Sequence, residues 1–579
     1  MSASETQRIN SSNLQQNLLQ ETNHAYEMAS MLGRQYNALL PISILPLELF
    51  LKIIRDVISC PSFGYPSNYL RYVSQVCHHW RKAVLGAPLL WSQLIDCNNI
   101  HPKWFRVVLR RARSSPLRVT IRPLWDEMEG ESKFAGPNVH LALRNLERVG
   151  GLDILCSVEE DIVRPMINHF QQPAPSLQCL TLSLSGCNDE DNDTNRDIQC
   201  LPANIFRGVT APLRRLTLSR CLIDFKAPLY RHLTSLSISQ IFRVVAPSVS
   251  DFLHLLRNMP DLTSLALTSA FSLSTITGRI EDVHLPRLSS LKISGMSAEC
   301  SQFLSHLHYP ALSRFELHLR GFDPGETEFA SLIKHQLSTI EPFLSCTVRM
   351  LDKYFEFSTR RHGIEDETES PLLCISCSML SSVSPTHTPR ILLSLVAYIA
   401  PRACHCERLA LTLDRNAGWP AETTFKCLTR TFSSVKRLDI MGTKRMQSCQ
   451  PVDDFFRYIS TPESEQPHDA TSRDSTAPKR VLLPNLQNLY MNGHGTSGAL
   501  ISFLEYRRNC GLAIETIEFR KGFEDPSFIQ SIKSLCISVT ILGRDANAVV
   551  APNLQQGSTA FFSYGAEEAD DPELDYIAG

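Results

Sequence analysis

Residues 45–91 read LPLELFLKIIRDVISCPSFGYPSNYLRYVSQVCHHWRKAVLGAPLLW, and the rest of the chain is organised around this stretch. Pro46 suits the first position of a helix, because the N–H that proline lacks has no partner there. After it, apolar residues recur every three or four positions, which predicts an amphipathic helix. The segment Cys60–Asn68 contains prolines and a glycine and ends that helix, and a second apolar stripe runs up to Trp80. A segment this small rarely builds a core alone, so we expect its apolar stripes to need a partner.

Three anchors in this stretch carry a family resemblance. They are, in order, Leu45-Pro46-x-Glu48-Leu49, Val76-Cys77-x-x-Trp80-Arg81 and Pro88-Leu89-Leu90-Trp91. Together they resemble an F-box, most closely that of the F-box-like proteins seen in fungi, although the connection between the helices is slightly long. The resemblance implies a module that docks on the Skp-type adaptor of a cullin–RING ubiquitin ligase. By position, it implies these adaptor-binding residues: Leu45, Pro46, Leu49, Ile53, Val76 and Trp80. The alternative is that they form the internal core of a helical cap.

Length and composition limit the class of protein. A chain of 579 residues exceeds what one hydrophobic core usually supports, so we expect several domains or a repeat array. The net charge of −2 argues against a broad nucleic-acid surface, and no apolar stretch reaches the length of a bilayer span. The first residues are polar and lack the apolar region of a secretory signal. The 18 cysteines are scattered through apolar segments, which favours reduced thiols. We therefore expect an intracellular protein of the cytoplasm or nucleus, without nucleic-acid or membrane partners.

A repeated unit, Pro-x-Leu-x-x-Leu-x-Leu, becomes legible in the second third of the chain. Its copies begin at Leu177, Leu213, Leu233, Leu262, Leu288 and Leu312. Four of the five steps between them lie in the range of about 20–29 residues that is typical of leucine-rich repeats, and the longest contains the polar insert Asn188–Asp197. One strand-containing unit cannot bury its apolar face alone. Stacked units can, which predicts a solenoid with parallel strands.

The register is lost over residues 321–400 and then returns. In the unclear stretch, Phe343–Phe357 predicts strands and Ser358–Ser370 predicts a charged loop. Later copies contain Leu409, Leu438, Leu489 and Ile517, and Ile532–Ile541 predicts a final strand. The sequence therefore predicts an α/β protein in which a small all-helical F-box module at 43–92 precedes an irregular leucine-rich-repeat solenoid, or horseshoe, at 102–544. The remaining segments are expected to be a disordered arm with a short lead-in helix (1–42, helix at His24–Leu39), a disordered insert (460–480) and a disordered acidic tail (545–579).

Two kinds of functional residue are weighed in the repeats. The strand positions between the inward leucines would line a concave face, and the candidates for contact with a target protein there are Lys292, Glu316, His318, Asp439, Tyr490, Glu518 and Arg520. The alternative for each is a solvated position with no ligand. Cys374-x-x-Cys377 and Cys404-His405-Cys406 are the best metal candidates, but cysteines are ordinary in an apolar strand, so no metal is expected. No Walker A, G-x-S-x-G or H-E-x-x-H pattern occurs, which leaves no specific reason to expect catalysis.

The resemblance and the repeats lead to one functional expectation. The chain would be the non-catalytic substrate-recognition subunit of an SCF-type ubiquitin ligase, with the F-box bound to a Skp-type adaptor and through it to a cullin. The repeats would hold an unknown target protein near the ubiquitin-charged enzyme, and no cofactor would be needed. The alternative is a leucine-rich-repeat scaffold that bridges proteins without any association with a ligase.

Overall fold

The computed structural model describes the chain in segments. These are residues 3–58, 66–93, 95–98, 100–122, 135–157, 163–185, 200–209, 213–241, 246–272, 280–322, 333–334, 336–337, 340–351, 354–361, 370–379, 388–413, 422–442, 450–460, 481–492, 498–520 and 526–542. The expected polar insert Asn188–Asp197, the insert from residue 461 to 480 and the acidic tail 545–579 lie outside the described residues.

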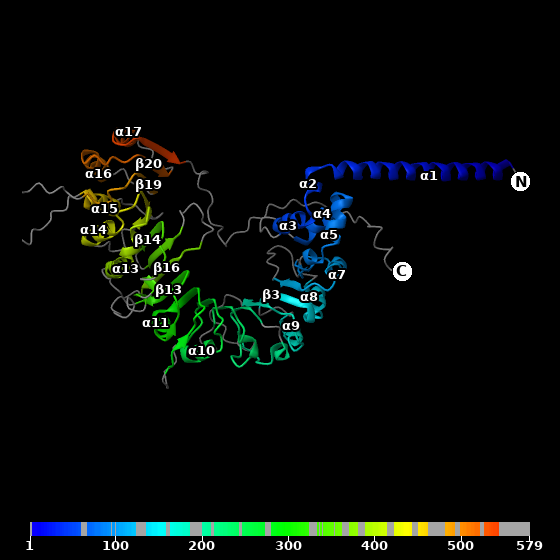
Figure 1. Cartoon of the computed structure of the whole chain (residues 1–579), viewed down its shortest axis with the longest axis horizontal. Coiled ribbons are helices and arrows are strands. Elements are labelled where there is room, and N and C mark those ends of the chain that lie inside the picture. The colour runs from blue at the N-terminus through cyan, green and yellow to red at the C-terminus, as the bar shows by residue number, and fades with distance from the viewer. Residues whose placement is uncertain are drawn as a thin grey trace, which may run out of the picture.

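In the described residues up to 93, the front of the molecule is built from helices. Helix α1 (Ala3–Ala38) projects away from the rest, and its last turns contact α2 and α5 (Figure 1). The sequence predicts a helix only from His24, whereas α1 begins at Ala3, so the expectation of a disordered arm is wrong for the residues before His24 that the structure describes. The helices that follow are α2 (Pro41–Ile44), α3 (Leu47–Ile58), α4 (Pro66–Val76), α5 (His78–Leu85) and α6 (Pro88–Ser92). They occupy the place expected for the helical module.

The rest of the described chain forms a mixed α/β body around one large, mostly parallel sheet. Its 17 strands, in spatial order, are β1 (Ile95–Asp96), β2 (Leu117–Ile121), β3 (Val149–Ser157), β4 (Cys179–Ser185), β6 (Arg215–Ser219), β8 (Ser235–Ser239), β9 (Ser264–Thr268), β11 (Ser290–Met296), β13 (Arg314–Phe322), β16 (Leu373–Met379), β15 (Tyr354–Arg360), β14 (Ser345–Leu351), β17 (Arg408–Leu413), β18 (Arg437–Gly442), β19 (Asn488–Asn492), β20 (Thr516–Arg520) and β21 (Ser538–Leu542). Two small pairs join β5 (Cys200–Leu201) to β7 (Leu222–Ile223) and β10 (Val283–His284) to β12 (Leu307–His308).

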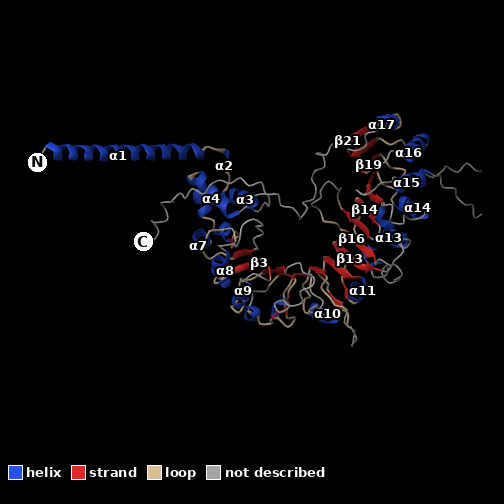
Figure 2. Cartoon of the chain, turned by 180° about the vertical axis from the view of Figure 1, so that it is seen from behind, coloured by secondary structure: helices blue, strands red, loops and turns tan. Residues whose placement is uncertain are grey.

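The sheet curves into an open arc with its strands on the inner side and its helices on the outer side (Figure 2). The outer helices are α7 (Pro102–Arg111), α8 (Ala135–Leu143), α9 (Val163–His169), α10 (Val249–Leu256), α11 (Ser297–Ser305), α13 (Thr388–Ala403), α14 (Glu422–Thr431), α15 (Gln450–Ser460), α16 (Gly498–Asn509) and α17 (Pro526–Lys533). Short 3₁₀ helices stand in their place between β4 and β6, where η3 (Ile205–Gly208) lies, and between β6 and β8, where η4 (Pro228–Tyr230) lies. A further one, η1 (Leu146–Arg148), follows α8. Neighbouring helices need a wider spacing than neighbouring strands. A stack with helices on one side and strands on the other therefore bends toward the strands, which accounts for the arc.

The repeated leucines occupy matching places in neighbouring strands. One line of register partners runs Leu180, Leu216, Leu236, Leu265, Leu291 and Phe315, and a second runs Leu409, Leu438, Leu489 and Ile517. All are buried, because period-2 alternation turns them toward the outer helices. Phenylalanines continue this core between helices, as in the contact of Phe252 with Phe271 and Phe303. The predicted strand register is therefore confirmed over these copies.

The unclear stretch proves to be a reordered part of the sheet. Strands β14, β15 and β16 form an antiparallel meander, and β16 rather than β14 pairs with β13. The next strand in the chain, β17, then pairs in parallel with β14. The three strands of the meander therefore lie in the sheet in the reverse of their order in the chain. Strands were predicted over Phe343–Phe357 and are present, but β15 extends to Arg360, into the predicted loop. The predicted final strand Ile532–Ile541 is wrong at its start, since Lys533 ends α17 and β21 begins at Ser538.

Candidate functional site

An apolar ledge lies on the helical module. On α3, Leu49, Ile53 and Val57 follow one another at four-residue spacing and are 50%, 46% and 43% exposed. On α4, Tyr72 and Val76 have the same spacing and are also exposed. We refer to these five residues as the apolar ledge. Single exposed apolar residues are ordinary on a protein surface, whereas grouped ones are typical of surfaces that contact another molecule.

A different face of α3 packs against the rest of the chain, and the ledge lies outside that contact. Phe50, Ile54 and Ile58 are buried and fill the core of the module, so the helix has already used the side that faces its own chain. Trp80 packs edge-on against Phe50 with ring centroids 5.0 Å apart and is half-buried. The apolar surface of α3 is therefore wider than the intramolecular contact requires.

The six predicted adaptor-binding residues divide into two groups. Those exposed in this chain are Pro46, Leu49, Ile53 and Val76, and those partly buried are Leu45 and Trp80. The module is joined to the arc behind it by aromatic contacts. The Arg111 guanidinium lies 4.6 Å from the ring centroid of Trp91 and 5.0 Å from that of Trp104, and the indole N–H of Trp91 donates to Val84 O at 2.9 Å. Of these contacts, the one between Arg111 and Trp91 connects the module to α7, and the Trp91–Val84 hydrogen bond holds Trp91 in place within the module.

The inner face of the arc carries the predicted target-binding residues, and the sheet gathers them into two clusters. Lys292 and Glu316 are register partners on β11 and β13, with His318 two residues further along β13. On the other side of the meander, Asp439, Tyr490 and Glu518 are successive partners on β18, β19 and β20. Arg520 follows on β20 and is exposed.

The Glu316 cluster holds a buried carboxylate among cations. Lys292 Nζ lies 2.8 Å from one carboxylate oxygen, and Arg314 Nε donates to the other at 2.7 Å. His318 Nε2 lies farther away, at 3.7 Å, and its Nδ1 is 2.7 Å from the Ser376 hydroxyl. His318, Lys292 and Arg314 together lower the pKa of Glu316 far below its usual range, against the opposing effect of burial. The carboxylate is thus ionised at neutral pH and held in place.

The Asp439 cluster is built in the same way. Asp439 is fully buried and accepts from Arg408 Nε at 2.6 Å and from Arg437 Nε at 2.9 Å. Arg437 also donates to Glu518 at 2.8 Å, and its guanidinium lies 5.8 Å from the ring centroid of Tyr490. The carboxylates of Asp439 and Glu518 raise the pKa of Arg437, although burial opposes them. Of the predicted contact residues in this cluster, Asp439 and Tyr490 are buried, so Glu518 and Arg520 offer the accessible charges.

Sequence reasoning missed the arginines that organise both clusters. Arg314 precedes Glu316 by two residues on one strand, and Arg437 precedes Asp439 in the same way. In a strand, residues i and i+2 lie on one face, so this Arg-x-acid pattern predicts an ion pair within the strand. The pattern was visible in the sequence. Arg408 could not be found in this way, because it reaches Asp439 from the neighbouring strand.

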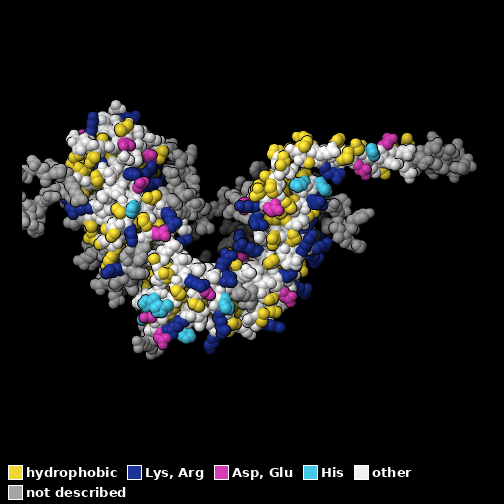
Figure 3. Space-filling model, in the orientation of Figure 1, with side chains coloured by type: hydrophobic (Ala, Val, Ile, Leu, Met, Phe, Trp, Pro, Cys, Tyr) yellow, Lys and Arg dark blue, Asp and Glu magenta, His cyan; other side chains and the backbone are white. Residues whose placement is uncertain are grey.

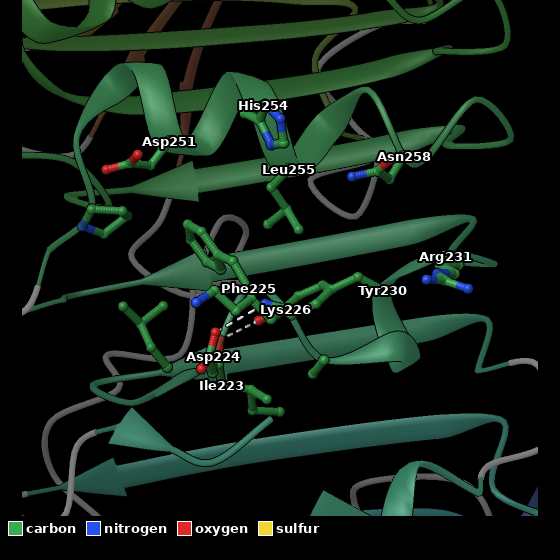
Figure 4. A pocket seen from close by; sticks show the side chains of 13 residues that line it. Ile223, Asp224, Phe225, Lys226, Tyr230, Arg231, Asp251, His254, Leu255 and Asn258 are labelled. Carbon is green, nitrogen blue, oxygen red and sulfur yellow. Dashed lines mark hydrogen bonds between the residues drawn. The ribbon is translucent and has the colours of Figure 1, made fainter. Parts of the chain in front are cut away.

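A cavity of about 690 Å³ lies on the outer layer between the β7–η4 segment and α10 (Figure 4). Part of its polar lining is hydrogen-bonded within the chain. Asp224 accepts from the Lys226 N–H at 2.9 Å, and the Tyr230 hydroxyl donates to Ile223 O at 2.9 Å. Side chains of both charges lie at the edge, among them Arg231 and Asp251. The described lining residues include no serine, threonine or cysteine.

The two cysteines of the Cys374-x-x-Cys377 motif lie on opposite faces of the sheet. Cys374 and Cys377 are three residues apart on β16, so they face opposite sides of it, and burial raises the pKa of Cys374 to about 12. Among the described residues, no group of three or more His, Cys, Asp or Glu side chains is placed to hold a metal ion. Within the same part of the chain, no helix is both long enough and apolar enough to cross a membrane.

Comparisons with known proteins add no family to this description. The sequence matches no family model, and no curated protein is significantly similar to it. The apolar ledge and the inner face of the arc are therefore the candidate functional surfaces.

Proposed function

We propose that this chain is the substrate-recognition subunit of an SCF-type cullin–RING ubiquitin ligase. The helical module 43–92 would be an F-box that binds a Skp-type adaptor, and through it a cullin. The arc would be a leucine-rich-repeat-type solenoid whose inner face binds a target protein. No catalytic group is then required of this chain, since holding the target near the ubiquitin-charged enzyme raises the effective concentration of its lysines.

The exposed stripe of α3 is the observation that carries this proposal. Leu49 and Ile53 belong to the residues that the F-box resemblance assigns to the adaptor, and both are about half exposed while their neighbours Phe50 and Ile54 are buried. A helix packed only within its own chain would need the second set alone. Covering the first set would contribute roughly 1 kcal/mol for each half-exposed side chain.

The shape of the arc supports the second half of the proposal. Parallel strands in register line its inner side and present alternate residues of every strand on one extended face. Extended concave faces of this kind are typical of repeat proteins that bind other proteins. The alternative, a scaffold without ligase association, needs the arc but gives the apolar ledge no role.

The experiment is a pull-down of purified Skp-type adaptor with the full chain carrying Leu49→Glu and Ile53→Glu. Both side chains are exposed in the free chain, so the variant should fold. Placing two carboxylates in an apolar contact should reduce adaptor recovery at least ten-fold.

The matched control is Val209→Glu, which places a carboxylate at a residue that is 51% exposed and outside the module. It should recover as much adaptor as the unmodified chain. Equal recovery by the unmodified chain and the ledge variant would refute the proposal, as would no recovery by either.

A further inference from the structure

The inner face of the arc carries an excess of positive charge. On the described strands of the large sheet, ten Lys and Arg side chains point away from the leucine core: Arg118, Arg215, Lys292, Arg314, Arg320, Arg349, Arg360, Arg408, Arg437 and Arg520. Six carboxylates share that side: Asp96, Asp153, Glu316, Glu356, Asp439 and Glu518. The surplus of four positive charges contrasts with the net charge of −2 of the whole chain. Basic side chains are visible along the inner edge of the arc (Figure 3).

Half of these cations are not neutralised on the face itself. Five of them form ion pairs with Glu316, Glu356, Asp439 or Glu518. The other five make no ion pair with a carboxylate among the described residues: Arg118, Arg215, Arg320, Arg360 and Arg520. Among the described residues, Arg320 donates to the Ser269 hydroxyl, and Arg215 donates to the Cys179 sulfur at 3.3 Å. Arg320, Arg360 and Arg520 lie on the half of the sheet that ends at β21.

The complementary charge is present in the same chain. The segment 567–575 reads EEADDPELD and contains six carboxylates, and residues 545–579 contain no Lys or Arg. We propose that this acidic segment binds the basic half of the inner face, between Arg320 and Arg520. The inference deepens the proposed function, because it rests on the inner face being the target-binding surface and names acidic segments as what that surface accepts.

The distances permit this contact. Arg320 on β13 and Arg520 on β20 are seven strand spacings apart, which is about 34 Å along the sheet at roughly 4.8 Å per spacing. Nine extended residues span about 30 Å. The 24 residues between Leu542 and Glu567 have a root-mean-square reach of about 25–30 Å as a flexible linker and about 80 Å fully extended. The segment can therefore reach the arginines, at an effective concentration of the order of millimolar.

The test measures binding of a fluorescent peptide of residues 563–579 to two forms of the full chain. In one form the tail is unchanged, and in the other its six carboxylates are replaced (Glu567→Gln, Glu568→Gln, Asp570→Asn, Asp571→Asn, Glu573→Gln and Asp575→Asn). The neutralised chain should bind the peptide at least about ten-fold more tightly, because its own tail no longer competes. Raising the salt concentration should weaken that binding.

Charge variants locate the contact. In the neutralised chain, Arg320→Gln with Arg520→Gln should weaken peptide binding roughly 3- to 30-fold. The matched control, Lys226→Gln with Arg231→Gln, removes the same charge from exposed residues at the outer-layer cavity and should leave binding unchanged.

Three results would overturn the inference: equal affinity of the two chains, no binding to the neutralised chain, or equal weakening by the control. The assay contains no adaptor, so these results are independent of the pull-down with the ledge variant. A chain that binds the adaptor but shows equal peptide affinity in both forms keeps the proposed function and loses this inference.

Discussion

Glu316 illustrates how single residues shape the inner face. Its carboxylate is almost fully buried, yet it remains charged because His318, Lys292 and Arg314 surround it. An isolated buried carboxylate would be costly, whereas one with several hydrogen-bonded cations is tolerated. Residues of this type organise other charges and offer little contact area themselves, so among the predicted contact residues Lys292 and His318 are the accessible part of this cluster.

The lowered pKa of Glu316 gives a pH-dependent prediction. Because the folded pKa lies below the unfolded value of about 4.3, the stability contributed by the ionised carboxylate is complete above about pH 5 and is lost as the pH falls further. Glu316→Gln should therefore be less stable than the unmodified chain at pH 7, and the difference between their urea midpoints should narrow toward pH 3. Urea unfolding monitored by circular dichroism across this range measures it.

Glu407→Gln is the matched control, since Glu407 forms an exposed pair with Lys436 at 2.7 Å. Exposed pairs contribute little, so its midpoint should stay close to that of the unmodified chain. A Glu316→Gln difference that stays constant from pH 7 to pH 3 would contradict the account of this cluster.

Some residues were beyond sequence reasoning. Arg507 is fully buried on α16 and donates to the carbonyls of Leu482, Leu483, Leu486 and Leu512, which holds the turn before β19. Leu483 in that turn has a φ of 50°. From sequence alone, an arginine on a helix is usually predicted to be exposed to solvent. Its role depends on a turn that lies more than 20 residues earlier in the chain, which no local pattern records.

At the scale of elements, the sequence predicts the regular parts well. Strands such as β6 and β8 follow directly from the leucine spacing, because each copy repeats the same burial pattern. The meander β14–β16 could not be predicted in its order, since the apolar pattern of a strand does not state which neighbour it pairs with. As a consequence, Glu316 on β13 pairs with Cys374 on β16. Their separation along the chain is much longer than one repeat.

Helix α1 is predicted to be readily cleaved by protease. Its side chains from Leu14 to Tyr36 are almost all exposed, and an isolated helix is marginally stable in water even when its residues favour helix. Cleavage by chymotrypsin after Tyr26, which is 70% exposed, should therefore proceed within about ten-fold of the rate for a peptide of residues 15–36.

The unmodified full chain at low concentration is the form to digest, with the products followed by mass spectrometry. Cleavage slowed 100-fold relative to the peptide would contradict the picture of a projecting helix and would mean that α1 packs against another surface.

At the scale of the whole molecule, two surfaces of different chemistry are held in one body. The ledge on α3 and α4 is apolar, and the inner face of the arc is polar and basic. The contact of Arg111 on α7 with Trp91 on α6 joins the helical module to the arc. A receptor needs this arrangement, because a target held by the arc must keep its position relative to whatever binds the ledge.

We propose that the ledge binds a Skp-type adaptor and that the arc does not. The test is hydrogen–deuterium exchange of the full chain, measured with and without purified adaptor. We expect slower exchange in α3 and α4 on addition of the adaptor and unchanged exchange in the strands from β2 to β21. Unchanged exchange in α3 and α4, or protection confined to the arc, would contradict it.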